Sequence, residues 1–193
     1  MTFLSDLMGL TPVLTDGITT LVLAMHVVIA VLVLFLIHDV LKKKLSPPLL
    51  WVSRHGLLLM FSVALVATSV SLFFSEIAMF QPCRFCWMQR IFMYPQVILL
   101  GGALFWKDRN IARYILLLSL VGIAISIFHY GEQVQSMLYP ELFDPLTPCD
   151  LSGVSCRATY VLEYGYITIP LMAGTAFLLN IIGSTTMLLA KKN

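Results

Sequence analysis

Five long apolar stretches constrain the fold of this chain more than any other feature of its sequence. A helix that crosses a bilayer needs roughly 20 mostly apolar residues. The five stretches that meet or approach this length are Ile18–Ile37, Leu57–Phe80, about Phe85–Trp106, Tyr114–Tyr130 and Ile167–Ala190. Of the 193 residues, 59% are hydrophobic and only 11% are charged, which is too little charge to cover a soluble domain. The sequence therefore predicts an all-α integral membrane protein with five spans.

The positions of the basic residues predict which side of the membrane each connector faces. Lysine and arginine cluster between spans one and two, between spans three and four, and after span five: Lys42, Lys43, Lys44 and Arg54, then Lys107, Arg109 and Arg113, then Lys191 and Lys192. By the positive-inside rule these three places are cytoplasmic. The leading segment Met1–Gly17 contains Asp6 and Asp16 and no basic residue, so we expect the N-terminus outside and the C-terminus inside. A cleaved signal peptide would begin with a basic region, so the first span is predicted to be a retained helix.

The same pattern divides the chain into two predicted parts. Residues 1–55 form an extracytoplasmic segment, one extra transmembrane helix and a basic cytoplasmic connector. Residues 56–193 form a four-helix transmembrane bundle core, whose outer loops carry the cysteines. The net charge is only +2 and no long basic block is present, which argues against nucleic-acid binding. The expected surroundings of the chain are the lipid bilayer.

The four cysteines, Cys83, Cys86, Cys149 and Cys156, all fall on the predicted outer side. Disulfides are the default in an oxidising compartment. Four cysteines allow three pairings, of which the short spacings favour Cys83–Cys86 with Cys149–Cys156. A C-x-x-C disulfide closes so short a loop that it stabilises little, which favours redox exchange over a structural role. Four thiolates could instead bind zinc, but the outer location argues against a metal and none is predicted. A non-catalytic membrane scaffold with structural disulfides or a zinc site is the alternative.

The residues around the C-x-x-C motif predict a reactive thiolate. Pro82 suits the first position of a helix, so both thiols would lie in the first two turns, where free backbone N–H groups stabilise negative charge. Arg90 follows Cys86 by four residues and would lie one turn below it on the same face. A charged residue at the edge of the hydrocarbon is often functional, and this one could bind a carbonyl oxygen of a membrane-soluble ligand. Snorkelling of Arg90 to the interface is the alternative.

Four strings of the sequence resemble a known family. They are similar to segments of the DsbB/BdbC family of membrane disulfide-generating proteins, and they read CRFCWMQRIFMYP, FHYGEQ, PCDLSGVSC and EYGYITIP. The resemblance covers about Gly56–Lys192. It is closer to the BdbC-like branch. The resemblance implies a thiol:quinone oxidoreductase of the bacterial cytoplasmic (inner) membrane, with its redox loops on the extracytoplasmic side. Such a protein oxidises a DsbA-like thioredoxin-fold partner and passes the electrons to a membrane quinone, ubiquinone or menaquinone.

The resemblance also implies a role for each cysteine and for one arginine. Cys83 and Cys86 match the pair next to the quinone, with Cys86 beside the ring. Arg90 matches the arginine near the quinone. Cys149 and Cys156 match the pair that meets the partner, and by order Cys149 would form the mixed disulfide.

Three features depart from the family or extend it. The span Ile18–Ile37 is extra to the usual four-helix frame. Gln89 stands where the enterobacterial branch has a glutamate. His129 is expected at the outer end of a span, much as a histidine is in BdbC-like sequences, and is a candidate for the quinone side of the site. The other histidines, among them His26, have no expected chemical role.

Overall fold

The described part of the fold contains five long helices and two short helical turns. The computed structural model describes residues 9–144, 146–151 and 153–192, so that Asp6, used above for orientation, lies outside the described residues. The long helices are α2 (Thr11–Lys42), α3 (Pro47–Leu72), α4 (Arg84–Trp106), α5 (Ala112–Leu138) and α6 (Ile169–Lys192). A π-helical turn, η1 (Phe73–Ile77), extends α3, and a 3-10 turn, η2 (Arg109–Ile111), precedes α5. Within the described residues the only β-structure is an isolated bridge between Glu163 and Ile167, so the all-α prediction is confirmed.

The lengths and compositions of the helices show a multi-pass membrane protein. Four segments are each long and apolar enough to cross a bilayer, namely α2, α3 together with η1, η2 together with α5, and α6. α4 has 23 residues, about 35 Å of helix, which is also sufficient. It is less hydrophobic because it carries residues such as Gln89 and Gln96, whose side chains are buried among the other helices. Such residues form hydrogen bonds between membrane helices, as Asn180 Nδ2 of α6 does with Gln96 Oε1 at 2.8 Å.

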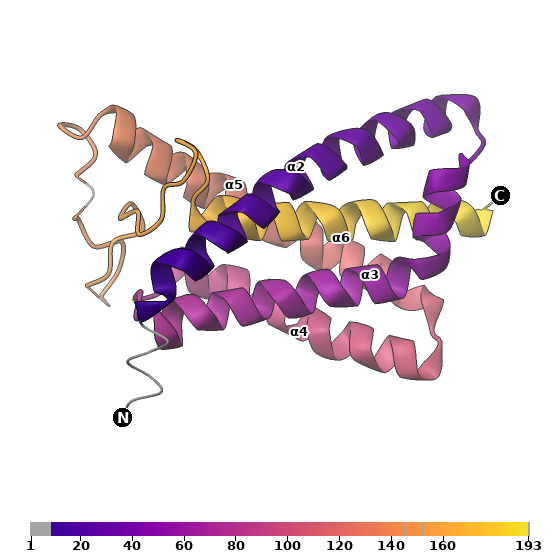
Figure 1. The fold of residues 1–193 in the computed structure, drawn as a ribbon, viewed down its shortest axis with the longest axis horizontal. Helices are drawn as coiled ribbons and strands as arrows, with labels where there is room; N and C mark the ends of the chain where they lie inside the picture. The colour runs from indigo at the N-terminus through magenta and orange to yellow at the C-terminus, as the bar shows by residue number, and fades with distance from the viewer. Residues whose placement is uncertain (1–8, 145, 152, 193) are drawn as a thin grey trace.

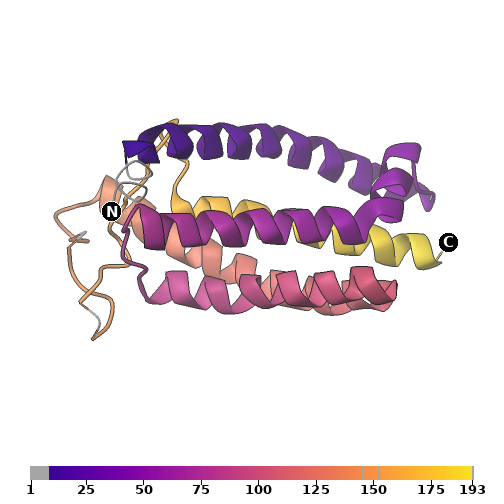
Figure 2. The ribbon, with the colours of Figure 1, turned by 60° about the horizontal axis from the view of Figure 1, so that its bottom comes forward.

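The helices run along a common long axis, with α2 lying across the outside of the other four (Figures 1 and 2). The starts of α2 and α4 and the described residues between α5 and α6 lie at one end, which we call the loop end (Figure 1). The turns between α2 and α3 and between α4 and α5 lie at the opposite end, together with the C-terminus. The three basic clusters therefore share one end of the molecule, and the four cysteines lie toward the other.

Several predicted boundaries differ from the structure, and α2 runs over Thr11–Lys42 where Ile18–Ile37 was predicted. α3 begins at Pro47 rather than near Leu57, because proline fits the first turn of a helix. The predicted division between residues 55 and 56 consequently falls within a helix. α5 continues eight residues beyond Tyr130, to Leu138, and ends shortly before Pro140. His129, which was expected at the outer end of a span, thus lies inside a helix that continues to Leu138.

Close contact between α5 and α6 forms the centre of the bundle. Phe177 of α6 is fully buried, and its ring lies directly against the backbone of Gly122. A Cβ atom at position 122 would overlap that ring. Small residues let membrane helices approach closely, and here the approach holds α5, which carries His129, at a fixed position beside α6.

Candidate redox site

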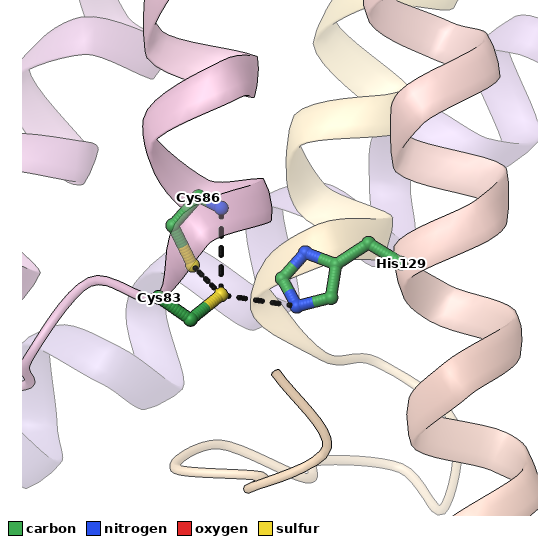
Figure 3. A group of neighbouring side chains, drawn as sticks. All are labelled: Cys83, Cys86 and His129. Atoms are coloured by element: carbon green, nitrogen blue, oxygen red, sulfur yellow. Dashed lines mark hydrogen bonds between the residues drawn. The ribbon is translucent and has the colours of Figure 1, made fainter. Parts of the chain in front are cut away.

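The C-x-x-C motif lies where α4 begins. Cys83 is the N-cap of α4, and its Sγ accepts a hydrogen bond from the backbone N–H of Cys86 at 3.4 Å. The sulfur thus occupies the place that a side-chain oxygen usually takes at a helix N-cap. The two sulfur atoms of this free dithiol lie 3.0 Å apart (Figure 3). Because they are already in contact, only a small movement is needed to form a disulfide.

His129 reaches the motif from the interior of α5. Its side chain is 1% exposed, and its Nε2 lies 3.5 Å from Cys83 Sγ (Figure 3). The same nitrogen lies 3.1 Å from the carbonyl oxygen of Cys156. One ring nitrogen therefore contacts both the first cysteine pair and the backbone of the second. The other nitrogen, Nδ1, is buried and has no hydrogen-bond partner among the described residues.

Two neighbouring groups favour the thiolate form of Cys83. The hydrogen bond with the Cys86 thiol has the largest effect, and the contact with His129 adds to it. Together they outweigh burial, which opposes ionisation, and lower the pKa of Cys83 from 9.0 to about 4. The sequence predicted a reactive thiolate at this helix start, with Arg90 one turn below Cys86. In the dithiol the lowered pKa belongs to Cys83, because its sulfur accepts the hydrogen bonds.

The second cysteine pair is a disulfide between Cys149 and Cys156, the pairing that the short spacing favoured. Cys156 is buried, with 2% of its surface exposed, whereas Cys149 is half-buried. Attack on a disulfide requires access to one sulfur atom. A thiolate that approaches from water therefore reaches Cys149 more easily than Cys156.

The last two turns of α5 hold the backbone next to Cys156. The Glu132 carboxylate accepts a hydrogen bond from Arg157 Nε at 2.9 Å, and Ser136 Oγ donates to the Arg157 carbonyl at 3.3 Å. Sequence reasoning missed this contact, because the predicted span ended at Tyr130. The signal that could have found it is the spacing of Glu132 and Ser136, which puts two polar side chains on one helix face.

Arg90 lies one turn below Cys86 and contacts α3. Its Nε donates to Ser71 Oγ at 3.1 Å, and its Nη2 donates to the Ser71 carbonyl at 3.0 Å. Tyr94 donates to the same Ser71 Oγ at 3.1 Å, and the Arg90 guanidinium lies 5.0 Å from the centre of the Trp87 ring. Ser71 lies just before η1, and π-helical turns of this kind are frequent at functional sites. Sequence reasoning missed Ser71 because it is 19 residues away from Arg90 along the chain.

A cavity of about 380 Å³ adjoins the motif, within the roughly 300–1,000 Å³ of small-molecule sites. At its loop end it is lined by Cys83, Cys86, Arg90 and His129. Farther from that end it is lined by apolar side chains of α2, α3 and α6: Met25, Val63, Val66, Ala67, Ala176, Phe177 and Leu179. Along α6 the lining runs from Ile169 to Leu179, a length of about 15 Å. A cavity with one polar end and a long apolar body suits an amphiphile that has a polar head and an apolar tail.

The residues at the polar end could also hold a metal ion. Cys83, Cys86 and His129 each offer one ligand atom, and these atoms all lie within 4.8 Å of one another. Thiolate sulfur and imidazole nitrogen are common zinc ligands. The geometry thus permits two kinds of chemistry, electron exchange and metal binding.

The chain is similar to known disulfide bond formation proteins. A model of the family described as "Disulfide bond formation protein DsbB" matches residues 53–155. The chain is 47% identical to "Disulfide bond formation protein C" of Bacillus subtilis (strain 168) over 120 residues, which are 62% of this chain and 83% of that protein. It is 41% identical to "Probable disulfide formation protein C" of Halalkalibacterium halodurans over 128 residues, 66% of this chain and 89% of that protein. No solved structure matches the chain significantly.

Proposed function

The chain belongs to the DsbB family of disulfide bond formation proteins, and from this premise we propose that it is a membrane thiol:quinone oxidoreductase. It reoxidises a DsbA-like thioredoxin-fold protein and passes the electrons through Cys149–Cys156 and then Cys83–Cys86 to a quinone. The observation that carries the proposal is the position of His129. Its Nε2 is within hydrogen-bond distance of both Cys83 Sγ and the Cys156 carbonyl, at the polar end of an apolar cavity.

The first exchange takes place at the second cysteine pair. A thiolate of the reduced partner attacks Cys149, the more accessible sulfur, and the bond to Cys156 breaks, with Cys156 leaving as a thiolate. The second thiolate of the partner then attacks the mixed disulfide and releases Cys149. The partner has now lost two electrons, and Cys149 and Cys156 have gained them.

The second exchange moves the electron pair to α4. The Cys156 thiolate attacks Cys83, its neighbour across His129, and the Cys83–Cys86 bond breaks to release a Cys86 thiolate. Cys149 then attacks Cys156, which restores the Cys149–Cys156 disulfide and releases Cys83 as a thiolate. The low pKa of Cys83, about 4, makes this sulfur a good leaving group.

The groups at the polar end of the cavity fit a quinone head. A quinone there accepts two electrons and two protons while the Cys83–Cys86 disulfide re-forms. The guanidinium of Arg90 has five N–H groups, of which two bind Ser71 in the described structure, and the others can donate to a carbonyl oxygen. The buried Nδ1 of His129, which lacks a partner among the described residues, is a further polar atom for such a ligand. Ubiquinone and menaquinone both share this head chemistry.

We also assign the loop end of the molecule to the extracytoplasmic side of the bacterial cytoplasmic membrane. The basic clusters at the opposite end support this orientation, since basic residues favour the cytoplasm. The N-terminus is then outside and the C-terminus inside. In this orientation Cys149 faces the compartment in which a secreted dithiol protein would be found.

Reconstitution tests the proposal directly. Protein in quinone-containing vesicles, supplied with a reduced thioredoxin-fold protein, should consume one quinone for each disulfide formed, since both are two-electron couples. Cys83→Ser and Cys86→Ser should abolish quinone reduction and leave the partner reduced. Arg90→Ala should weaken quinone use with both disulfides still formed, whereas Arg84→Ala, which changes an exposed arginine between the two cysteines, should not. Oxidation of the partner at the unaltered rate by Cys83→Ser would refute the proposal.

The metal-ligand geometry of Cys83, Cys86 and His129 supports a second candidate, a non-catalytic scaffold with a zinc site. It makes a different prediction for the purified protein. Zinc should be present at one ion per chain, resist removal and disappear in Cys83→Ser, while thiol exchange with the partner should not occur. Elemental analysis, together with the assay above, separates the two functions.

A further inference from the structure

The helix α2 forms one wall of the cavity, although it lies outside the residues 53–155 that match the family. Four of its side chains line the cavity: Ile18, Leu21, Val22 and Met25. They follow one another at helical positions i, i+3, i+4 and i+7, so they form a single stripe on one face of α2. This stripe spans about 10 Å along the helix axis. The cavity wall therefore includes a segment that the family match does not cover.

Specific polar contacts hold this wall in place. Thr20 Oγ1 lies 2.9 Å from the hydroxyl of Tyr164, and His26 Nδ1 lies 3.1 Å from the hydroxyl of Tyr166. His26 Nε2 lies 3.0 Å from Thr175 Oγ1 of α6. Lipid tails are as apolar as the surface of a membrane helix, so hydrogen bonds to neighbouring segments add to packing in fixing the rotation of the helix. These contacts turn the stripe toward the cavity.

The α2 stripe faces the apolar body of the cavity rather than its reactive groups. Cys86 and Arg90, both on α4, belong to the polar end, and Arg90 is bound to Ser71 of α3. In α2 only apolar side chains line the cavity, and the deepest of them, Met25, lies on the side away from the loop end. A ligand with its polar head near Cys86 would therefore meet α2 with its tail.

We propose that α2 is the tail-binding wall of this cavity, and that Leu21, Val22 and Met25 determine which apolar tails the electron acceptor can carry. The inference rests on the proposed quinone function and deepens it. The ligand class is a quinone with a polyprenyl tail. The α2 stripe contributes to binding of the tail and leaves the chemistry at Cys83 and Cys86 unaffected.

A matched pair of variants tests this role. Val22→Phe enlarges a side chain that lines the cavity, whereas Val27→Phe makes the same change on another face of α2, where Val27 is 64% exposed. Binding is measured with the full-length protein in detergent, by quenching of its tryptophan fluorescence, for a quinone with a polyprenyl tail and for the same head group without a tail. A size change in an apolar pocket alters affinity by about tenfold or more, so Val22→Phe should weaken binding of the tailed quinone by at least this factor. Binding of the tailless quinone should be unchanged, and Val27→Phe should affect neither.

A second variant tests whether the hydrogen bonds of His26 hold the α2 stripe against the cavity. His26→Leu removes both hydrogen bonds of His26 at similar side-chain size, and it should also weaken binding of the tailed quinone alone. Equal effects on tailed and tailless quinones, or equal effects of the Val22 and Val27 substitutions, would overturn the inference. If the unaltered protein binds neither quinone, the proposed function fails instead. The two failures are thus distinguishable.

Discussion

Replacing Cys86 with alanine should return the Cys83 thiol toward an ordinary pKa. The contact with the Cys86 thiol is the largest of the effects that lower the pKa of Cys83 to about 4, and alanine cannot supply it. Burial of Cys83, which raises the pKa, would remain. The experiment is best made with Cys149 and Cys156 replaced by alanine, which leaves Cys83 and Cys86 as the only thiols of the four. The backbone carbonyl at position 156, which His129 contacts, is retained.

The thiolate fraction is the quantity to measure, because reaction rates would hide the change. With a pKa of about 4, nearly all Cys83 is thiolate at neutral pH, whereas with the ordinary value of 9.0 only about 1% is thiolate at pH 7. A thiolate of lower pKa is also a weaker nucleophile, with a Brønsted slope of about 0.4–0.5. Over this range of pKa the loss of nucleophilicity is about 100- to 300-fold, which offsets the gain in thiolate.

The assay is the ultraviolet absorbance of the thiolate, followed from about pH 3 to about pH 10. Because the pKa is depressed, the thiolate should be lost as the pH falls through about 4, whereas the stability that it gives to the reduced protein should decline progressively from about pH 9 to about pH 4. Cys86→Ala should move this step upward by several pH units. His129→Leu should move it upward by less, since His129 is the smaller cause. A step that stays near pH 4 in Cys86→Ala would refute the role of the sulfur–sulfur contact, and a larger shift in His129→Leu would reverse the order of causes.

Two further predictions concern the contacts that position the site. Ser71→Ala removes one acceptor from Arg90 and should raise the KM for quinone by about tenfold or more in steady-state assays, as expected for a hydrogen bond to a charged group. An unchanged KM would show that Ser71 does not position Arg90. Gly122→Ala should lower stability by about 1–3 kcal/mol in thermal unfolding, because the added methyl group overlaps the buried Phe177 ring. Gly174→Ala is the matched control, since its Cβ would meet Ser126 at an ordinary 3.4 Å, and equal losses in both variants would contradict the packing explanation.

Hydropathy predicted the number of helices, because each span must be apolar over the thickness of the bilayer. It could not predict where the helices end, since a helix continues beyond the membrane without an apolar signal. Residues 131–138, which include several polar side chains, form the last two turns of α5, where Glu132 binds the Arg157 side chain and Ser136 binds its carbonyl. The extension that sequence reasoning missed is therefore the part of α5 that contacts the second disulfide loop.

The site could be predicted only where its contacts are local in the sequence. The pairing of Cys149 with Cys156 and the position of Arg90 below Cys86 follow from spacings of seven and four residues. The contacts of His26 with Tyr166 and Thr175 join residues 140 and 149 positions apart. No local pattern encodes such contacts, and for this reason His26 was expected to have no role.

Burial of the sulfur atoms gives a physical reason for two disulfides in place of one. Cys149 is half-buried beside the aqueous side, whereas Cys156 and Cys83 are 2% and 4% exposed. Cys86 lines the apolar cavity. Under the proposed function, a soluble thiol meets Cys149 first and an oxidant in the cavity meets the Cys83–Cys86 pair, because the buried Cys156 lies between them in the relay and does not line the cavity. A single pair open to both sides would let any small thiol in water reduce the quinone-linked disulfide directly. With two pairs, electrons must pass between Cys156 and Cys83, and His129 contacts both of these residues.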